Sequence, residues 1–360
     1  MRSPWMRVVL LGLLVALPLS SPAQEPTPPT PPDPAPKPAE APAFKISGLL
    51  YGDYYGVLQS HRDELEGENG FWIRRLYFTY DHTLSTALSL RVRLEANSQG
   101  DFLSTGVTTP YVKDAWLKWA RGAHALTAGL APTANINFVD DFQGYRSVEK
   151  NPFDLYRWDS SRDLGLVLEG TLGGGRRTSY SFQFGNGSGT GSEVDQSKAV
   201  RGQLAHRFAS GLVLEGYADW QDRPDARDVW TVEAFAGWRE KTWRASVQYG
   251  RQERREAGPR GTDLSLDFLS AFAAGRLSPR VTLLGRVDRN FDPVPNGETT
   301  DYLPFSDQAP STFAYVGLEV TLGGTVHLIP NVELVSYDEA ADGTTPGTDV
   351  VPRLTLFFSW

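Results

Sequence analysis

An alternation of apolar and polar residues at every second position, repeated from Phe44 to the end of the chain, constrains the fold more than any other feature. In residues 88–96, leucine, valine and alanine alternate with serine, arginine and glutamate, and residues 179–184, 243–250 and 280–288 repeat the pattern. A period of two predicts β-strands with one apolar and one polar face. Because the polar faces are charged like a protein surface, they rule out a dry sandwich core.

From Phe44 onward the chain divides into about sixteen such segments of roughly 9 to 13 residues. Their length fits a membrane crossing, since about 9 to 11 residues of a tilted strand span the apolar band. We expect strands, with boundaries correct to within a few residues, at 45–58, 70–81, 85–97, 109–121, 123–131, 162–172, 175–186, 197–209, 211–221, 228–239, 241–252, 262–276, 279–290, 311–322, 324–337 and 348–360.

The connections between these segments alternate between tight and long. An even number of strands with short periplasmic turns and long extracellular loops describes a transmembrane β-barrel. The predicted fold is therefore all-β, a single antiparallel transmembrane barrel of about 16 strands. The tight set is 81–85, 121–122, 172–175, 209–211, 239–241, 278–279 and 323–324, and the long set is 60–69, 97–108, 132–161, 187–195, 222–227, 253–261, 290–310 and 338–348.

The N-terminal residues precede the alternating pattern. Residues 1–23 have the charged start, apolar stretch and small residues of a secretory signal peptide. Residues 24–43 are rich in proline, alanine and threonine, which predicts an extended periplasmic tether before a barrel at 44–360. A mean hydropathy of −0.34 is too polar for a bundle of membrane helices. The chain has no cysteine, so it has no disulfide framework.

Aromatic residues gather near the strand ends on the apolar face, where membrane interfaces are expected. Trp220, Tyr249 and Phe184 lie at the loop ends. The last segment, 353–360, resembles the terminal strand of outer-membrane barrels, although the usual last residue is Phe. That resemblance implies outer-membrane lipid and the barrel-assembly machinery as partners. At the turn ends we expect a girdle of Tyr80, Trp119, Trp238, Trp243 and Trp360.

Two basic residues fit the alternation badly. Arg74 shares the parity of the apolar residues around it, and Lys113 poses the same problem in its strand. Either these side chains lie above the girdle, or a β-bulge breaks the pattern.

Seven short phrases after Phe44 are informative in their order: Phe71–Leu76, Asp114–Trp116, Gly129 with Pro132, Ser161–Gly165, Gly185–Gly187, Arg286–Asp288 and Pro330–Asn331. In this order they resemble the outer-membrane porins similar to the phosphate-selective O and P channels. The resemblance implies a trimeric channel of 16 strands with one loop folded into the lumen. Phosphate selectivity in that family goes with a basic ladder and lysines at the constriction. The connection 132–161 is not lysine-rich, so the resemblance does not carry the substrate across.

The polar parity of the strands predicts the residues that line the pore. Arg75, Arg91 and Arg93 lie on neighbouring strands, where they could form a basic strip that attracts anions. The alternative is that these arginines form ion pairs with Glu95 and Asp114 across the strands and stiffen the wall. The predicted pore-lining residues are Arg75, Arg91, Arg93, Glu95, Asp114, Lys118, Arg201, Arg244, Arg286 and Asp288, and the same parity adds Arg207, Arg280, Arg353, Glu169, Glu215, Asp219, Glu233, Asp267, Glu319 and Glu333.

The longest connection, 132–161, is rich in aromatic and charged residues, which argues against disorder. We expect it to constrict the pore, with a lid over the mouth as the alternative. Aromatic rings beside charges also suit a sugar ring. Its candidate residues are Asp140, Asp141, Tyr145, Arg146, Lys150, Tyr156, Arg157 and Trp158.

These features predict an outer-membrane porin of a Gram-negative-type bacterium. It would be a homotrimer whose water-filled channel passes ions and small polar solutes, with a modest preference for anions. The alternatives are a substrate-specific sugar or phosphate channel, an outer-membrane hydrolase, and a soluble β-sandwich that binds carbohydrate. The five histidines are scattered and no metal-ligand spacing occurs, so we expect no enzyme, cofactor or metal site. A net charge of −8 disfavours a nucleic-acid partner.

Overall fold

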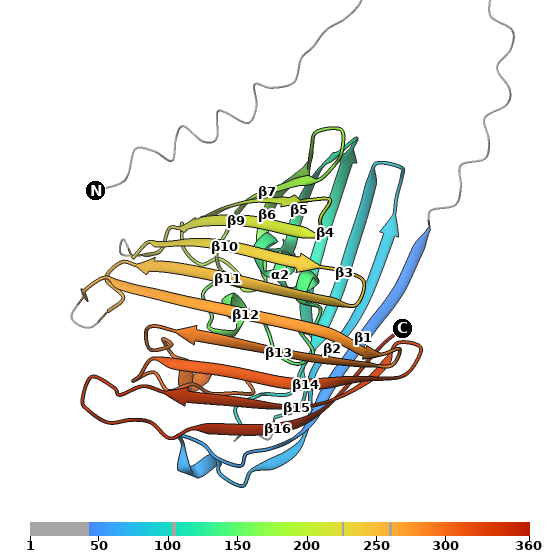
Figure 1. The fold of residues 1–360 in the computed structure, drawn as a ribbon. Helices are drawn as coiled ribbons and strands as arrows, with labels where there is room; N and C mark the ends of the chain where they lie inside the picture. The colour runs from blue at the N-terminus through green and yellow to red at the C-terminus, as the bar shows by residue number, and fades with distance from the viewer. Residues whose placement is uncertain (1–42, 103–105, 225–226, 259–260) are drawn as a thin grey trace, which may run out of the picture. The chain divides into compact units, whose positions relative to one another are not determined.

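The computed structural model describes residues 43–360 except 103–105, 225–226 and 259–260. The predicted signal peptide and all but the last residue of the predicted tether lie outside this part. The described residues form one closed antiparallel barrel, in which each strand pairs with the next and β16 pairs with β1 (Figure 1). The strands are β1 Phe44–Gly56, β2 Asn69–Thr83, β3 Leu88–Ala96, β4 Tyr111–Arg121, β5 His124–Pro132, β6 Arg162–Leu172, β7 Thr178–Gly185, β8 Ala199–Arg207, β9 Leu212–Gln221, β10 Val229–Arg239, β11 Trp243–Arg254, β12 Leu264–Ser278, β13 Val281–Asn290, β14 Ser311–Gly323, β15 Val326–Tyr337 and β16 Asp349–Ser359.

The predicted fold class is confirmed: each of the sixteen expected segments matches one strand to within three residues. Closure gives every strand a partner on both sides, so the barrel presents no open edge. In the part of the chain that the structure describes, the helices lie in connections between strands: α2 Ala134–Gln143, α3 Pro152–Leu155, and the short 3-10 helices η1 Asp63–Leu65 and η4 Gly297–Thr299. Among the described residues, no helix is long and apolar enough to cross a membrane.

The connections differ at the two ends of the barrel. Seven of them have two to five residues, and we call that end the turn end. The other eight have 7 to 29 residues and define the loop end. Gly122 and Gly324 lie in two-residue turns with φ of 62° and 55°, a left-handed conformation that glycine adopts without strain.

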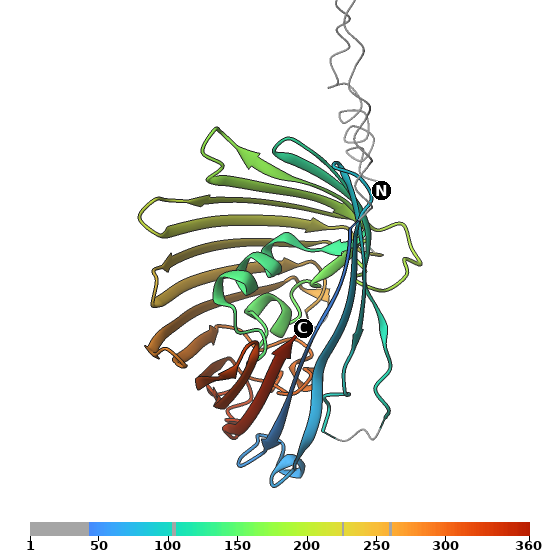
Figure 2. The same ribbon diagram turned by 90° about the vertical axis from the view of Figure 1, so that its right-hand side faces the viewer.

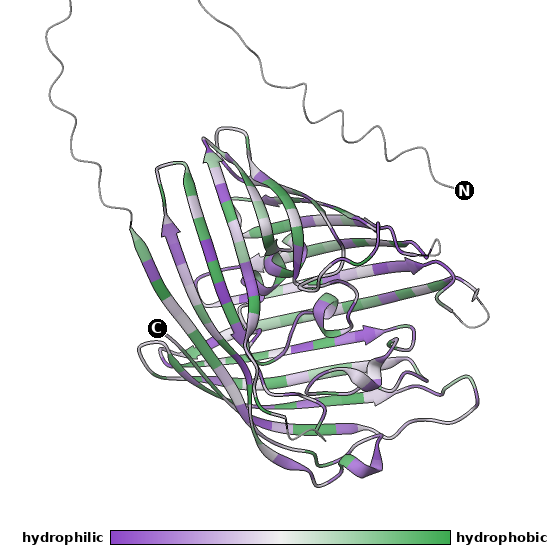
Figure 3. Cartoon of the chain, turned by 180° about the vertical axis from the view of Figure 1, so that it is seen from behind, coloured by the Kyte–Doolittle hydropathy of each residue, from purple (hydrophilic) through white to green (hydrophobic). Residues whose placement is uncertain are grey.

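Apolar and polar residues alternate along the strands (Figure 3). The exposed large apolar side chains lie on the outer face of the barrel, and buried polar and charged side chains lie on its inner face. The outward Leu166 and Val247 are 48% and 50% exposed, whereas the inward Asp114 is fully buried. This inversion of a water-soluble protein suits lipid outside and polar surroundings inside. The predicted girdle residues lie near the turn end, with Trp119, Trp243 and Trp360 exposed and Tyr80 and Trp238 half-buried.

Both residues that misfit the alternation lie at β-bulges. The pairing of β1 with β2 shifts at Arg74, and that of β3 with β4 shifts at Lys113. Each bulge turns two consecutive side chains toward the lumen, so Arg74 and Lys113 are only 3% and 6% exposed. Of the two explanations considered, the bulge is correct.

One inward prediction is wrong. Asp267 lies on the outer face, where its carboxylate accepts hydrogen bonds from Tyr249 and, at 3.0 Å, from Arg251. The neighbouring Phe268 is fully buried inside the barrel. The parity of β12 is reversed relative to expectation because its large aromatic residues pack against a loop in the lumen.

The C-terminal residue takes part in closing the barrel. Trp360 N donates to Gly48 O at 3.0 Å, and Gly48 N donates to Trp360 O at 3.1 Å. The indole ring also lies over Gly48, since a Cβ placed there would be 2.1 Å from the ring. A larger residue at position 48 would displace the ring.

Deleting Trp360 should weaken the barrel, because it removes two hydrogen bonds of about 1 kcal/mol each and the ring that covers Gly48. The measurement is the temperature at which the folded, fast-migrating form on a gel converts to the unfolded form. Trp243→Ala, which truncates an exposed girdle residue elsewhere, is the control. An equal shift in both variants would contradict a closing role for Trp360.

Candidate functional site

The connection between β5 and β6, residues 133–161, lies inside the barrel, where Figure 2 shows its two helices enclosed by the strands. Inward-facing residues of β13 and β14 hold it. Tyr145 Oη donates to Glu319 at 2.7 Å, and Tyr156 Oη donates to Asp288 at 2.8 Å. The connection, which we call the inner loop, therefore occupies the lumen and is not a lid over the mouth.

An apolar core forms between the inner loop and one side of the barrel wall. Val139 and Phe142 of α2 pack against Val213 and Phe235 of β9 and β10. Each fully buried apolar side chain contributes about 1.5–3 kcal/mol. One side of the lumen is therefore packed rather than open. The larger cluster includes Ile136, Val148, Phe153, Tyr156 and Trp158 of the loop with Phe268, Phe272, Leu284, Phe305, Phe313 and Tyr315.

Helix α2 is seated by a glycine and capped by arginines from the wall. Gly237 of β10 leaves room for the Phe142 ring, since a Cβ there would lie 2.5 Å from it. Arg244 Nε donates to Gln143 O at 2.9 Å, and the Arg239 guanidinium lies 4.8 Å from the Phe142 ring centroid. Cations at the last carbonyls of a helix stabilise its negative end.

On the opposite side of the lumen, the wall carries more cations than carboxylates. Glu95 lies between Arg75 and Lys113, at 3.2 and 3.0 Å. Asp114 lies between Arg93, at 3.2 Å, and Arg162. The wall strip made of these six residues thus has four cations for two carboxylates. Arg75 and Arg93 do pair with Glu95 and Asp114, and a net charge of +2 remains.

The inner loop faces this strip with the opposite balance. Arg146 forms ion pairs with Asp140 and Asp154, so one cation lies between two carboxylates. Burial opposes ionisation of Asp154, but the charges of Arg146 and Lys150 outweigh it and lower the pKa of Asp154 below its usual value. The loop face therefore stays charged at neutral pH, opposite a positive wall.

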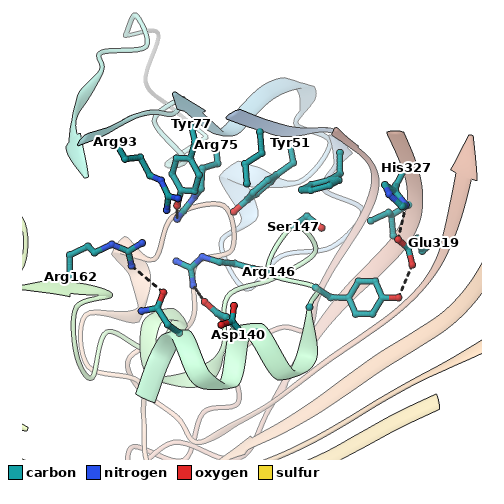
Figure 4. A pocket seen from close by; sticks show the side chains of 17 residues that line it. Tyr51, Arg75, Tyr77, Arg93, Asp140, Arg146, Ser147, Arg162, Glu319 and His327 are labelled. Carbon is teal, nitrogen blue, oxygen red and sulfur yellow. Dashed lines mark hydrogen bonds and ion pairs between the residues drawn. The ribbon is translucent and has the colours of Figure 1, made fainter. Parts of the chain in front are cut away.

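Two cavities lie between the wall strip and the inner loop. The turn-side cavity, of about 260 Å³, is lined by Tyr51, Tyr77, Arg93 and Arg162, whose side chains converge in Figure 4. The loop-side cavity, of about 220 Å³, is lined by Glu95, Lys113, Lys150 and Asp301 among others. Arg75 from the wall and Arg146 from the loop line both cavities. These two guanidinium groups mark the boundary between the cavities.

The other predicted pore-lining residues face inward at different places. Arg91 pairs with Asp81 at 2.6 Å and Lys118 with Glu169 at 2.5 Å near the turn end, and both cations stack over Trp116. The predicted pore-lining residues on the wall behind the inner loop line neither cavity. Arg201 pairs with Asp159 and Asp163, and Arg286 pairs with Asp288. Arg244 donates a hydrogen bond to Gln143 O.

The predicted loop residues divide between the cavities and the core. Asp140, Asp141, Tyr145 and Arg146 line the turn-side cavity, and Lys150 lines the loop-side cavity. Tyr156 and Trp158 are buried in the apolar cluster and line neither. Arg157 is partly exposed and donates to Thr299 Oγ1 at 2.7 Å.

Several residues of the site were missed by the sequence analysis. Lys113 was noticed only as a misfit, and Arg162 only as part of a short phrase. Two consecutive polar residues, Lys113-Asp114, in an otherwise alternating strand were the available signal of a bulge. Tyr51 and Tyr77 carried no such signal, because inward tyrosines look like any other polar-face residue.

A charged tie at the loop end holds the connection 291–310, which contributes Asp301 to the loop-side cavity. Buried His61 Nδ1 lies 2.8 Å from Asp349 Oδ1, and Nε2 lies 3.2 Å from Glu298 Oε1. Tyr337 Oη donates to Asp349 at 2.6 Å, and Arg62 lies 3.9 Å from Glu298. Burial opposes charge on the ring, but hydrogen bonds and charges of Asp349 and Glu298 outweigh it and raise the pKa of His61 above 6.5.

No family model and no curated protein matches the chain, but solved structures do. An anion-selective porin from Comamonas acidovorans has a TM-score of 0.65 at 9% identity, covering 89% of this chain and 100% of that one. The outer membrane channel DcaP of Acinetobacter baumannii gives 0.63 at 12%, covering 89% and 98%. OmpT, an outer-membrane protein of Vibrio cholerae, gives 0.60 at 10%, covering 90% and 99%.

The chain has the porin fold. The likeness covers 89 to 90% of the chain. At identities of 9 to 12% it establishes the architecture and does not transfer a substrate. The narrower resemblance to the phosphate-selective O and P channels stays a prediction.

Gly237→Val should displace Phe142 and loosen α2, because overpacking a filled site costs about 1–3 kcal/mol. We expect faster amide hydrogen exchange in residues 134–143, by about tenfold for each 1.4 kcal/mol. Adding Phe142→Ala should bring exchange back toward that of the natural chain. Gly202→Val, at a site with open space, is the control. Unchanged hydrogen exchange in Gly237→Val would contradict the conclusion that Gly237 makes the space for the Phe142 ring.

The tie at His61 should weaken as the pH rises. A raised folded-state pKa means that the stabilisation is complete below the unfolded pKa of 6.5 and is lost as the pH rises through the folded value. The unfolding temperature should therefore fall from about pH 6 to about pH 9 more in the natural chain than in His61→Gln. Equal pH dependence in the two proteins would rule out this tie.

Proposed function

We propose that this chain is an outer-membrane porin that forms a water-filled channel for passive diffusion of ions and small polar solutes, with a modest preference for anions. One observation carries the proposal. Two cavities follow one another between the turn end and the loop end, and their linings share Arg75 of the wall and Arg146 of the inner loop. In the proposed channel these two spaces belong to one path, and the guanidinium groups of Arg75 and Arg146 form its constriction.

The charges along this path favour small anions. The wall strip has four cations for two carboxylates, and charges at the narrowest point of a channel decide which ions pass. The facing loop carboxylates share Arg146 and give the passage a transverse field. Such a field orients polar solutes without binding them tightly, which is what passive diffusion requires.

The surroundings of the barrel are proposed on the same basis. The apolar outer face and the girdle fit an outer membrane, with turns and tether in the periplasm and loops outside. A homotrimer is consistent with the trimer form of OmpT of Vibrio cholerae, which has a TM-score of 0.59 at 10% identity. The predicted anion preference is in line with the anion-selective porin from Comamonas acidovorans, although the preference named there belongs to that protein.

A substrate-specific phosphate or sugar channel is the second candidate. Lys113 and Lys150 in the loop-side cavity, with Tyr111 beside them, favour an oxyanion over a sugar. In bilayer recordings, a phosphate channel would show a chloride current that saturates and is blocked by phosphate at low concentration. An unspecific porin would show a current that rises steadily with salt.

Removing the two excess wall cations should shift selectivity toward cations. In Arg93→Gln with Lys113→Gln, Glu95 keeps Arg75 and Asp114 keeps Arg162, so each carboxylate retains a partner. One unit charge 4 Å away changes the energy of an ion in water by about 1 kcal/mol, a factor of about five, with opposite sign for anions and cations. The anion-to-cation permeability ratio should therefore fall at least about fivefold.

The measurement is the reversal potential of planar bilayers in a salt gradient. The matched control is Arg223→Gln with Arg255→Gln, which removes the same charge at the loop end, far from the wall strip. Unchanged selectivity in the wall variant would mean that these side chains do not face the current. Absence of conductance in the natural protein would refute the porin proposal itself.

A further inference from the structure

The two ends of the barrel carry opposite charge. With the strand residue at either end of each connection included, the seven turns contain seven Arg and Lys and one Glu, a net charge of +6. The described residues of the seven loops other than the inner loop contain 19 Asp and Glu and six Arg and Lys, a net charge of −13. Residues 1–42 lie outside the described part and are not counted.

Charges at both ends reach the lumen. At the turn end, Arg207, Arg239 and Arg244 point inward and lie over the rings of Phe138, Phe142 and Tyr145, at 4.8 to 5.2 Å from the ring centroids. At the loop end, Asp301 lines the loop-side cavity. Fixed charges act over about 10 Å at 0.1 M salt, so the rims influence ions that enter each mouth.

We infer that this channel rectifies, passing more current when the loop side is positive than when it is negative. The inference rests on the proposed porin function and adds a direction to it. The fixed charge along the axis runs from a negative loop rim, past the positive wall strip, to a positive turn rim. A channel with fixed charge of opposite sign at its two ends conducts like a diode, with a current that depends on the direction of the voltage.

The direction follows from which ions each mouth collects. The negative loop rim concentrates cations and the positive turn rim concentrates anions. With the loop side positive, cations move inward from the loop rim and anions move inward from the turn rim, so both accumulate in the lumen and raise its conductance. With the polarity reversed, each ion is drawn out through the mouth that favours it, and the lumen is depleted.

The test is a current–voltage curve of the full mature protein in a planar bilayer with KCl. Orientation is read from Asp342→Cys, a single cysteine in a chain that has none, with a charged thiol reagent added to one side. At about 0.1 M salt the current ratio at opposite voltages should be about 1.5 to 2, and at about 1 M, where charges act over only about 3 Å, it should approach 1.

Two charge variants locate the cause. Arg176, Arg177, Lys241 and Arg280 are exposed turn residues, and changing all four to Gln lowers the turn end from +6 to +2. Asp63→Asn, Glu68→Gln, Glu339→Gln and Asp342→Asn change four exposed loop residues and reduce the loop end from −13 to −9. Each variant should lower the ratio at about 0.1 M while leaving the conductance at about 1 M unchanged.

The outcomes separate the inference from the proposed function. A linear curve at low salt in an open channel contradicts the rectifier and leaves the porin intact. A ratio that persists at high salt and in both variants means that the shape of the constriction causes it, which also contradicts the inference. Absence of conductance in every orientation overturns both.

Discussion

The structure depends on the pairing of β1 with β16, because only a closed sheet leaves no backbone donor or acceptor unpaired against lipid. All other features follow from that closure. The terminal residue pairs with Gly48, so the chain has no free strand edge at its end. Short turns suffice on one side because every neighbour in the sheet is a neighbour in sequence. The outer face can then be apolar, since its backbone needs nothing from the surroundings.

Closure creates a second requirement, because the wall residues of a 16-stranded barrel cannot fill its interior. The inner loop meets it on one side. Aromatic residues of β12–β14 face inward and pack with Phe153, Tyr156 and Trp158, so this part of the wall is a protein core. The opposite side of the lumen keeps its charges and two cavities. The position of the inner loop therefore determines which part of the barrel wall lines the cavities and which part packs against the loop.

The sequence predicted the strands because the outward-facing parity is apolar in nearly every strand. It also predicted an important loop, from length and aromatic content. It could not predict which inward residues the loop would cover, because Arg93 and Arg286 have the same parity and differ only in what lies in front of them. The prediction placed Asp267 on the inner face because it assumed that the inward positions of every strand are polar. In β12 the inward positions are apolar, since they pack against the inner loop. The bulges at Arg74 and Lys113 were visible only as exceptions.

The net charge of the chain and the charge of its wall strip have opposite signs. The chain carries a net charge of −8, yet its wall strip carries +2. Acidic residues are concentrated at the loop end, where water and salt screen them, whereas the strip lies in a narrow space with low-dielectric walls that focus its field. Sharing each carboxylate between two cations leaves the strip positive, and the opposite charges that face it are the inner-loop carboxylates Asp140 and Asp154, which Arg146 already pairs. In the proposed channel, selectivity would therefore be set where the wall strip and the inner loop face each other, and not by the net charge of the chain.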